Sequence, residues 1–260
     1  MTEVLYQSEF STFNVLGLPI AAVTPEMASQ IIHSWAQDDK GRMICLRDVH
    51  GVMLALDDAE LFEIHLAADM LTPDGTPLVW IGKLRGIHVE QTCGANLLEQ
   101  VMRGSVSSGL RHYFYGGNDG VAEQMVRELR AQYPGAAIVG HGTPPFRSLT
   151  ASEFSDLVEE IRLSHADVVW IGLSTPKQER LMHQLKDHIP ATCLGIGAVY
   201  DFVTGRVKRA PRWMQRLGLE WLHRLLSEPR RLWRRYLVLA PRFVWKVVRL
   251  ELIKKLQIVK

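Results

Sequence analysis

The sequence lacks a hydrophobic run long enough to cross a membrane, and it contains few cysteines. No window holds the roughly 18 uncharged apolar residues that a membrane-spanning helix needs. The first ten residues are acidic and contain no apolar segment, so we expect no secretory signal. Cys45, Cys93 and Cys193 lie far apart without metal-ligand spacing, which predicts small buried side chains in a reducing cytoplasm.

Common phosphate- and metal-binding motifs are also missing. The chain has no GxGxxG, no P-loop and no HExxH, and its ten histidines form no cluster with ligand spacing. It also has no Asp-x-Asp pair, which would be the usual carboxylate site for a divalent metal on a nucleotide diphosphate. We therefore expect neither a metal nor a bound cofactor.

Charge is distributed unevenly along the chain. The net charge is only +2, but residues 205–260 contain sixteen Lys and Arg against three acidic residues. That segment therefore carries +13 and the rest of the chain −11. Such asymmetry is typical of a segment that binds a charged surface.

The middle of the chain alternates short β-rich runs with amphipathic helices. Expected helix starts are Asn118 or Asp119, the capping box at residues 150–153, and a Thr175 cap followed by Pro176. Nearly continuous apolar runs are typical of parallel strands covered on both faces. The five expected strands are residues 42–46, 111–117, 136–140, 167–173 and 191–197.

This alternation predicts an α/β fold with a Rossmann-like, mostly parallel sheet flanked by helices. The pattern changes after residue 204, where no strand signal remains. We expect a core at residues 1–204 and a basic, all-helical C-terminal appendage at residues 205–260. Breaks between its helices are expected near Gly218, Pro229 and Pro241.

Three loops are candidates for a ligand site, because open parallel sheets bind ligands where strands end and helices begin. They are residues 68–80, 115–120 and 172–179. Each also has a simpler interpretation. The Gly116–Gly117 pair can be only a turn, Gln178 can merely close a capping box, and Asp74 before Gly75 is a common turn pair.

Together these segments resemble the WecG/TagA/CpsF glycosyltransferases, also called glycosyltransferase family 26. The matching pieces are TPDGTPLVW, YFYGGNDGVAEQM, VVWIGLSTPKQE, the long run from GIGAVYDFVTGRVKRAP to RLLSEPRR, and the basic tail. They follow the family's order over roughly residues 12 to 250. The resemblance implies an inverting, metal-independent transfer of a sugar from a nucleotide diphosphate, here UDP, to a polyprenyl-diphosphate-linked saccharide. The pathways it implies make cell-surface polysaccharides, on the cytoplasmic face of the bacterial inner membrane.

The resemblance also implies roles for residues. Asp74 becomes the expected general base, and arginines of the appendage complete the site over the donor. Which of Arg209, Arg212, Arg216 and Arg224 contacts the diphosphate stays open, and the resemblance allows self-association of the core. The expected substrate contacts are Asp48, His50, Gly75, Gln91, Asn96, Gly116, Gly117, Lys177, Gln178, Glu179, Asp201, Arg209, Arg212 and Arg224.

The chain departs from the family pattern in three segments. Leu46 and Asp48 replace the usual Thr and Asn, Gln91 stands where an Arg is common, and residues 142–146 read GTPPF in place of GYF. Asp48 should disfavour an anionic sugar unless His50 or an arginine offsets its charge, which favours a neutral hexose or N-acetylhexosamine.

The tail predicts an amphipathic helix lying on an anionic membrane surface, with its apolar face packed on the core as the alternative. Two other functions stay open. A membrane-associated scaffold without catalysis is one, and a nucleic-acid-binding protein is the other, although nucleic-acid arms are usually poor in large aliphatic residues. The expected membrane contacts are Arg231, Arg234, Arg235, Arg242, Trp245, Lys246 and Arg249.

Overall fold

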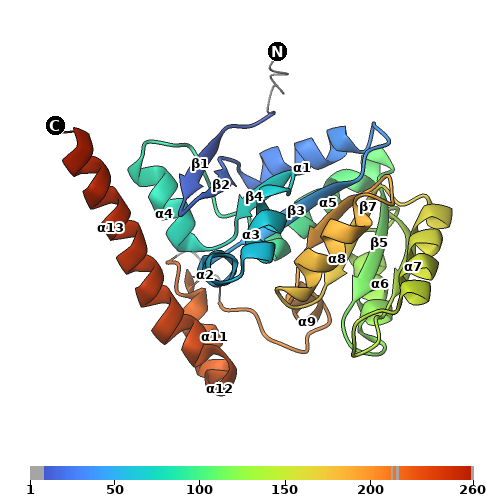
Figure 1. The fold of residues 1–260 in the computed structure, drawn as a ribbon. Helices are drawn as coiled ribbons and strands as arrows, with labels where there is room; N and C mark the ends of the chain where they lie inside the picture. The colour runs from blue at the N-terminus through green and yellow to red at the C-terminus, as the bar shows by residue number, and fades with distance from the viewer. Residues whose placement is uncertain (1–8, 212, 215–216, 259–260) are drawn as a thin grey trace, which may run out of the picture.

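The computed structural model describes residues 9–211, 213–214 and 217–258. Within these ranges, six parallel strands form one sheet in the order β4-β3-β8-β7-β5-β6, which confirms the predicted α/β fold (Figure 1). The strands are β3 (Arg42–Arg47), β4 (Met70–Pro73), β5 (Arg111–Gly116), β6 (Ala137–Gly142), β7 (Val168–Gly172) and β8 (Thr192–Gly195).

The sequence predicts five of these strands but not β4. This strand has only four residues, and its last is a proline followed by the Asp-Gly pair, so the segment resembles a loop. An antiparallel hairpin of β1 (Thr12–Val15) and β2 (Leu18–Ala21) was not expected either.

Helices cover both faces of the sheet, as expected. Side chains alternate along each strand: Met43 and Cys45 of β3 pack on one face, whereas Ile44 and Leu46 pack on the other. On the first face lie α2 (Val49–Asp57), α3 (Ala59–Leu66), α7 (Ala151–Ser164) and α8 (Lys177–Leu185). On the second lie α1 (Pro25–Trp35), α5 (Gly94–Ser108), α6 (Val121–Gln132) and α9 (Val199–Val203), while α4 (Thr76–Leu84) follows β4 and packs with the first cluster.

The helix starts agree only in part with the sequence. The capping box of Thr150 and Glu153 is confirmed. The expected caps at residues 118–119 are wrong, because Gly120 in a left-handed conformation (φ 76°) precedes α6. The Thr175 cap is also wrong: α8 begins at Lys177, and the Thr175 hydroxyl donates to Glu179 instead.

The C-terminal segment is helical, as expected. It forms α11 (Glu220–Ser227), α12 (Pro229–Trp233), the π-helical turn η1 (Arg234–Leu239) and α13 (Ala240–Ile258). Gly218 lies just before α11 and Pro229 is the first residue of α12, but the predicted break at Pro241 is wrong. This proline is the second residue of α13, directly after the π-helical turns of η1, and α12, η1 and α13 follow each other without a loop.

Helix α13 runs along one side of the molecule beside α2, and its end extends away from the sheet (Figure 1). Phe243 is buried in the core cluster, and Arg242 donates two hydrogen bonds to Asp57 at 2.6 and 2.7 Å. No helix among the described residues is both long and apolar enough to cross a membrane.

Candidate active site

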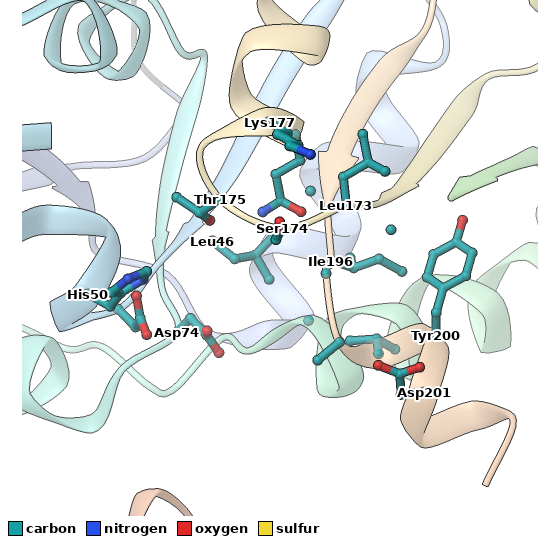
Figure 2. Close-up of a pocket in the computed structure, with 18 of the residues that line it drawn as sticks. Leu46, His50, Asp74, Leu173, Ser174, Thr175, Lys177, Ile196, Tyr200 and Asp201 are labelled. Carbon is teal, nitrogen blue, oxygen red and sulfur yellow. The ribbon is translucent and has the colours of Figure 1, made fainter. Parts of the chain in front are cut away.

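A cleft of about 2020 Å³ lies across the carboxyl ends of the sheet strands. Loops after β3, β4, β5, β7 and β8 form its floor, and α11, α12 and η1 of the appendage line the side opposite. Figure 2 shows His50 and Asp74 on one side of the view, Tyr200 and Asp201 on the other, and the loop of Leu173 and Ser174 between them. All three loops singled out from the sequence contribute to this cleft.

Asp74 follows β4 directly, and backbone contacts hold its loop in place. Its N–H donates to the carbonyl of Arg47 at 2.8 Å, and Gln91 Nε2 donates to the Asp74 carbonyl at 2.8 Å. Burial, followed by repulsion from Asp48, raises the pKa of the Asp74 carboxyl to about 7, although Arg235 opposes this increase. A carboxyl group with such a pKa can accept a proton near neutral pH.

Asp48 follows β3, the strand next to β4, and the pKa of its carboxyl group is shifted in the opposite direction. Its Oδ1 accepts the N–H of Gly51 at 2.8 Å and caps α2, and its Oδ2 accepts from Arg235 of η1. Burial favours the neutral acid, but the attraction of Arg235 and the Gly51 hydrogen bond outweigh it, so the pKa falls to about 2. Burial lowers the pKa of the adjacent His50, so its imidazole is neutral at pH 7.

A buried polar network that the sequence did not indicate lies beneath this floor. Arg47 Nη2 donates to Glu179 Oε1 at 2.5 Å, and Arg47 Nη1 lies 2.5 Å from His65 Nε2. Burial lowers the pKa of His65 to about 4, which leaves it neutral and able to accept from Arg47. The structure therefore places Glu179 under the cleft and not on its lining. Arg47 ends a strand that also contains Arg42, and His65 lies on a helix with Glu60 and Glu63, so no sequence pattern marked either side chain as buried.

Of the two glycines at the end of β5 that were predicted to contact the substrate, only one lines the cleft. Gly117 lines the cleft, whereas Gly116 (φ 151°) packs on the neighbouring strand, where an added Cβ would lie 2.6 Å from Gly172 Cα. Lys177 and Gln178 both line the cleft at the start of α8. The Oε1 atom of Gln178 is buried and has no hydrogen-bond partner among the described residues, so it can accept from a ligand.

Arginines of the appendage border the open side of the cleft. Arg209 Nη2 donates to Asn96 at 3.0 Å and its Nε to Glu220 at 3.3 Å, while Asn96 itself lines a neighbouring recess of about 520 Å³. Arg224 stacks over Phe202 at 5.7 Å. Arg212 and Arg216 lie outside the described residues. The cleft is also lined by Asp48, His50, Gly75, Gln91, Asp201, Arg209, Arg224, Arg231, Arg234 and Arg235.

The residues expected at a membrane are thus in two places. Arg231, Arg234 and Arg235 line the cleft together with the core loops. Arg242, Lys246 and Arg249 lie on α13, where Arg249 stacks on Trp245 at 5.3 Å. Within the described ranges, no group of three or more His, Cys, Asp or Glu is placed to hold a metal ion.

This geometry, an acidic residue with a pKa near 7 facing arginines across a strand-end cleft, agrees with the family that the sequence matches. The profile of the glycosyl transferase WecG/TagA/CpsF family matches residues 13–257, and the chain belongs to this family. It is a glycosyltransferase.

A curated relative has a more detailed name. The chain is 29% identical over 205 residues to the N-acetylglucosaminyldiphosphoundecaprenol N-acetyl-beta-D-mannosaminyltransferase of Bacillus subtilis (strain 168). The match covers 77% of this chain and 77% of that protein.

Proposed function

We propose that this protein transfers a sugar from a UDP-sugar donor to a polyprenyl-diphosphate-linked saccharide in cell-surface polysaccharide synthesis. The name of the Bacillus subtilis relative supports this substrate class, with an N-acetylhexosamine as the sugar transferred. The observation that carries the proposal is the placement of Asp74, with a pKa of about 7, in a cleft bordered by arginines.

The reaction we propose is a single displacement with inversion. The acceptor hydroxyl attacks the anomeric carbon of the donor while the bond from that carbon to the diphosphate oxygen breaks. The hydroxyl proton passes to the Asp74 carboxylate, and the departing UDP keeps the electron pair of the broken bond. Asp74 lies at the strand ends, and hydrogen bonds from its N–H to Arg47 and from Gln91 to its carbonyl fix the backbone that carries the carboxylate before the substrates bind.

In this reaction, cations of the appendage stabilise the leaving diphosphate. Arg224, Arg231 and Arg234 line the cleft. A guanidinium group can donate two parallel hydrogen bonds to two oxygens of one phosphate. The Nε of Arg224 is buried without a hydrogen-bond partner among the described residues, so it can donate to a ligand. Positive charge placed where negative charge develops lowers the barrier without any metal.

We also infer that the protein binds the membrane at its cytoplasmic face through the outer side of α13. Twelve of the nineteen large apolar side chains that are exposed in the described chain belong to residues 213–252. On α13 they include Val244, Trp245, Val248 and Leu252, which share the face opposite the buried Phe243. An amphipathic helix in the headgroup plane would cover this face and bring the lipid-linked acceptor close to the cleft.

The test is release of UDP from a panel of UDP-sugars with a GlcNAc-diphosphate-polyprenol acceptor and EDTA present. We expect UDP-N-acetylmannosamine or another UDP-N-acetylhexosamine to react. Asp74→Asn should lose about 10²–10⁴-fold in kcat, the usual contribution of a general base. Asp156→Asn, an exposed carboxylate of α7, is the matched control and should retain full activity. Turnover of the Asp74 variant close to that of wild type would remove Asp74 from the mechanism.

A further inference from the structure

Asp48 connects the core with the appendage inside the cleft. One carboxylate oxygen accepts from Gly51 at the start of α2, and the other accepts from Arg235, 187 residues further along the chain. The side chains of Asp48 and Arg235 are only 20% and 24% exposed. The pair is therefore screened less by solvent than an ordinary surface ion pair.

The packing of the appendage fixes the position of Arg235. Leu232 on α12 and Phe243 on α13 are 3% and 2% exposed, so a buried side chain anchors the helical segment on each side of Arg235. Between them η1 has π-helical turns, which change the direction of side chains relative to a regular helix. Arg235 Nε has no hydrogen-bond partner in the described part of the chain.

Asp48 and Asp74 occupy the ends of neighbouring parallel strands, and their loops touch. A Cβ added at Gly75 would lie 3.0 Å from Asp48 Cα. Arg235 is thus an appendage cation that can compensate two carboxylates at once. Besides Asp48, the charged and titratable groups around Asp74 are Arg47 and His50 from the core strand end, Cys93 from the loop before α5, and Arg209, Glu220, Arg224, Arg235 and Tyr236 from the appendage.

We propose that Asp48 is a positioning residue that holds Arg235 in the cleft, where the guanidinium charge keeps the neighbouring Asp74 available as a base. This inference rests on the proposed function. With Arg235 in place, its charge stabilises both carboxylates. Without the charge of Arg235 in the otherwise unchanged cleft, Asp48 and Asp74 would face each other uncompensated, and the more weakly stabilised Asp74 would take up a proton. The charge effects on the pKa of Asp74 have the directions that this proposal needs, since Asp48 raises the pKa and Arg235 lowers it.

The experiment is a ¹³C NMR titration of the Asp74 carboxyl, assigned by the resonance that Asp74→Asn removes. Arg235→Gln should raise the titration midpoint of Asp74 by about one pH unit, a tenfold change in proton affinity. Asp48→Asn removes a repulsion but also releases Arg235, so it should move the midpoint by less than about half a pH unit, whereas a full unit downwards would show that Arg235 stays in place without Asp48. Asparagine is a good N-cap, so Asp48→Asn removes the charge but keeps the cap of α2. In the Asp48→Asn background, Arg235→Gln should change the midpoint little further, because Arg235 is then no longer held beside Asp74.

Arg242→Gln is the matched control, because it removes an ion pair of α13 with Asp57 outside the cleft. It should leave the Asp74 midpoint unchanged. Arg235→Lys keeps the charge and should stay within about 0.3 pH units of wild type, which covers the case in which Arg235→Gln unfolds. A midpoint that Arg235→Gln does not move, or that Arg242→Gln moves equally, would overturn the proposal and leave the Asp48–Arg235 pair a structural contact.

The titration needs no substrate, so its outcome is independent of the proposed reaction. If the midpoints move as expected but no UDP-sugar is turned over, the coupling holds and the proposed function fails. Where turnover is measurable, the acidic limb of kcat/KM should move by the same amount as the NMR midpoint in each variant. A loss of rate with an unmoved acidic limb contradicts the proposal.

Discussion

At the scale of single residues, the cleft contains two aspartates of opposite character. Asp48 has a hydrogen bond from a helix N-terminus and a guanidinium partner, and its pKa is about 2. Asp74 lies at the end of the neighbouring strand, where its carboxyl group is buried beside a like charge, and its pKa is about 7. The two proposed roles, a permanent anion and a proton acceptor, therefore rest on a difference in environment and not in residue type.

The raised pKa of Asp74 predicts a cost to stability. The folded protein holds a proton on Asp74 that the unfolded chain releases above the ordinary aspartate pKa of 3.8, so the contribution of Asp74 to stability falls as pH rises from about 4 to about 7. The full shift corresponds to about 4 kcal/mol, and solvent in the open cleft should reduce it to about 1–2 kcal/mol.

Asp74→Asn should therefore be more stable than wild type at pH 8, with the difference vanishing near pH 4. Urea unfolding at the two pH values measures this. Asp48→Asn is the control of opposite sign. The folded pKa of Asp48 is depressed, so its ionised form stabilises the fold at pH 8, and the substitution should destabilise there. A pH-independent change in the Asp74 variant would argue against a raised pKa.

At the scale of elements, the Arg47–Glu179 pair joins β3 to the start of α8. Both side chains are almost completely buried, so removal of one partner leaves an uncompensated charge. Glu179→Ala should lower the free energy of unfolding by about 3–5 kcal/mol. Arg180 is the next residue of α8, and its ion pairs with Asp58 and Glu60 are exposed. Arg180→Ala should therefore change the free energy of unfolding little. Urea unfolding midpoints compare the two, and equal effects would contradict a structural role for the buried pair.

Local sequence patterns predicted the elements whose own residues form a clear apolar run. The apolar runs of β3, β5, β7 and β8 specify buried strands without any tertiary information. Strand β4 and the start of α8 could not be predicted in this way. Four residues ending in a proline carry too little periodicity. The Thr175 hydroxyl donates to Glu179, four residues on, whose carboxylate is held by Arg47, a partner that only the fold brings near. Pro241 lies inside a continuous helical segment, directly after the π-helical turns of η1, and the local sequence did not indicate that change of helix type.

At the scale of the whole molecule, the charge asymmetry and the helical appendage were visible in the sequence, but the contacts of the appendage were not. Arg235 was predicted to contact a membrane together with its neighbours, and the structure places it on Asp48 in the cleft. The assignment of Asp74 as base came from family resemblance, because an Asp-Gly pair alone indicates a turn. A pairing across 187 residues depends on how the appendage folds back, and no periodicity encodes that.

The exposed face of α13 gives a prediction for the molecule as a whole. Trp245 and Val248 are 59% and 51% exposed on the side away from the core. Trp245→Glu with Val248→Glu should weaken binding to phosphatidylglycerol vesicles by about tenfold or more in a flotation assay. Insertion of each apolar side chain contributes about 1.5–3 kcal/mol, and the added carboxylates are repelled by the anionic surface.

Because Phe243 stays in place, this double variant should keep α13 docked on the core, which removal of residues 241–260 would not. Leu163→Glu, an exposed apolar position on α7, is the control and should bind vesicles like wild type. Binding should also weaken as salt rises from about 0.1 to about 1 M, since the basic side chains beside this face are screened while the apolar contacts are not. Unchanged flotation of the α13 variant would show that another surface meets the membrane, and the cleft would then receive its lipid substrate from a different side.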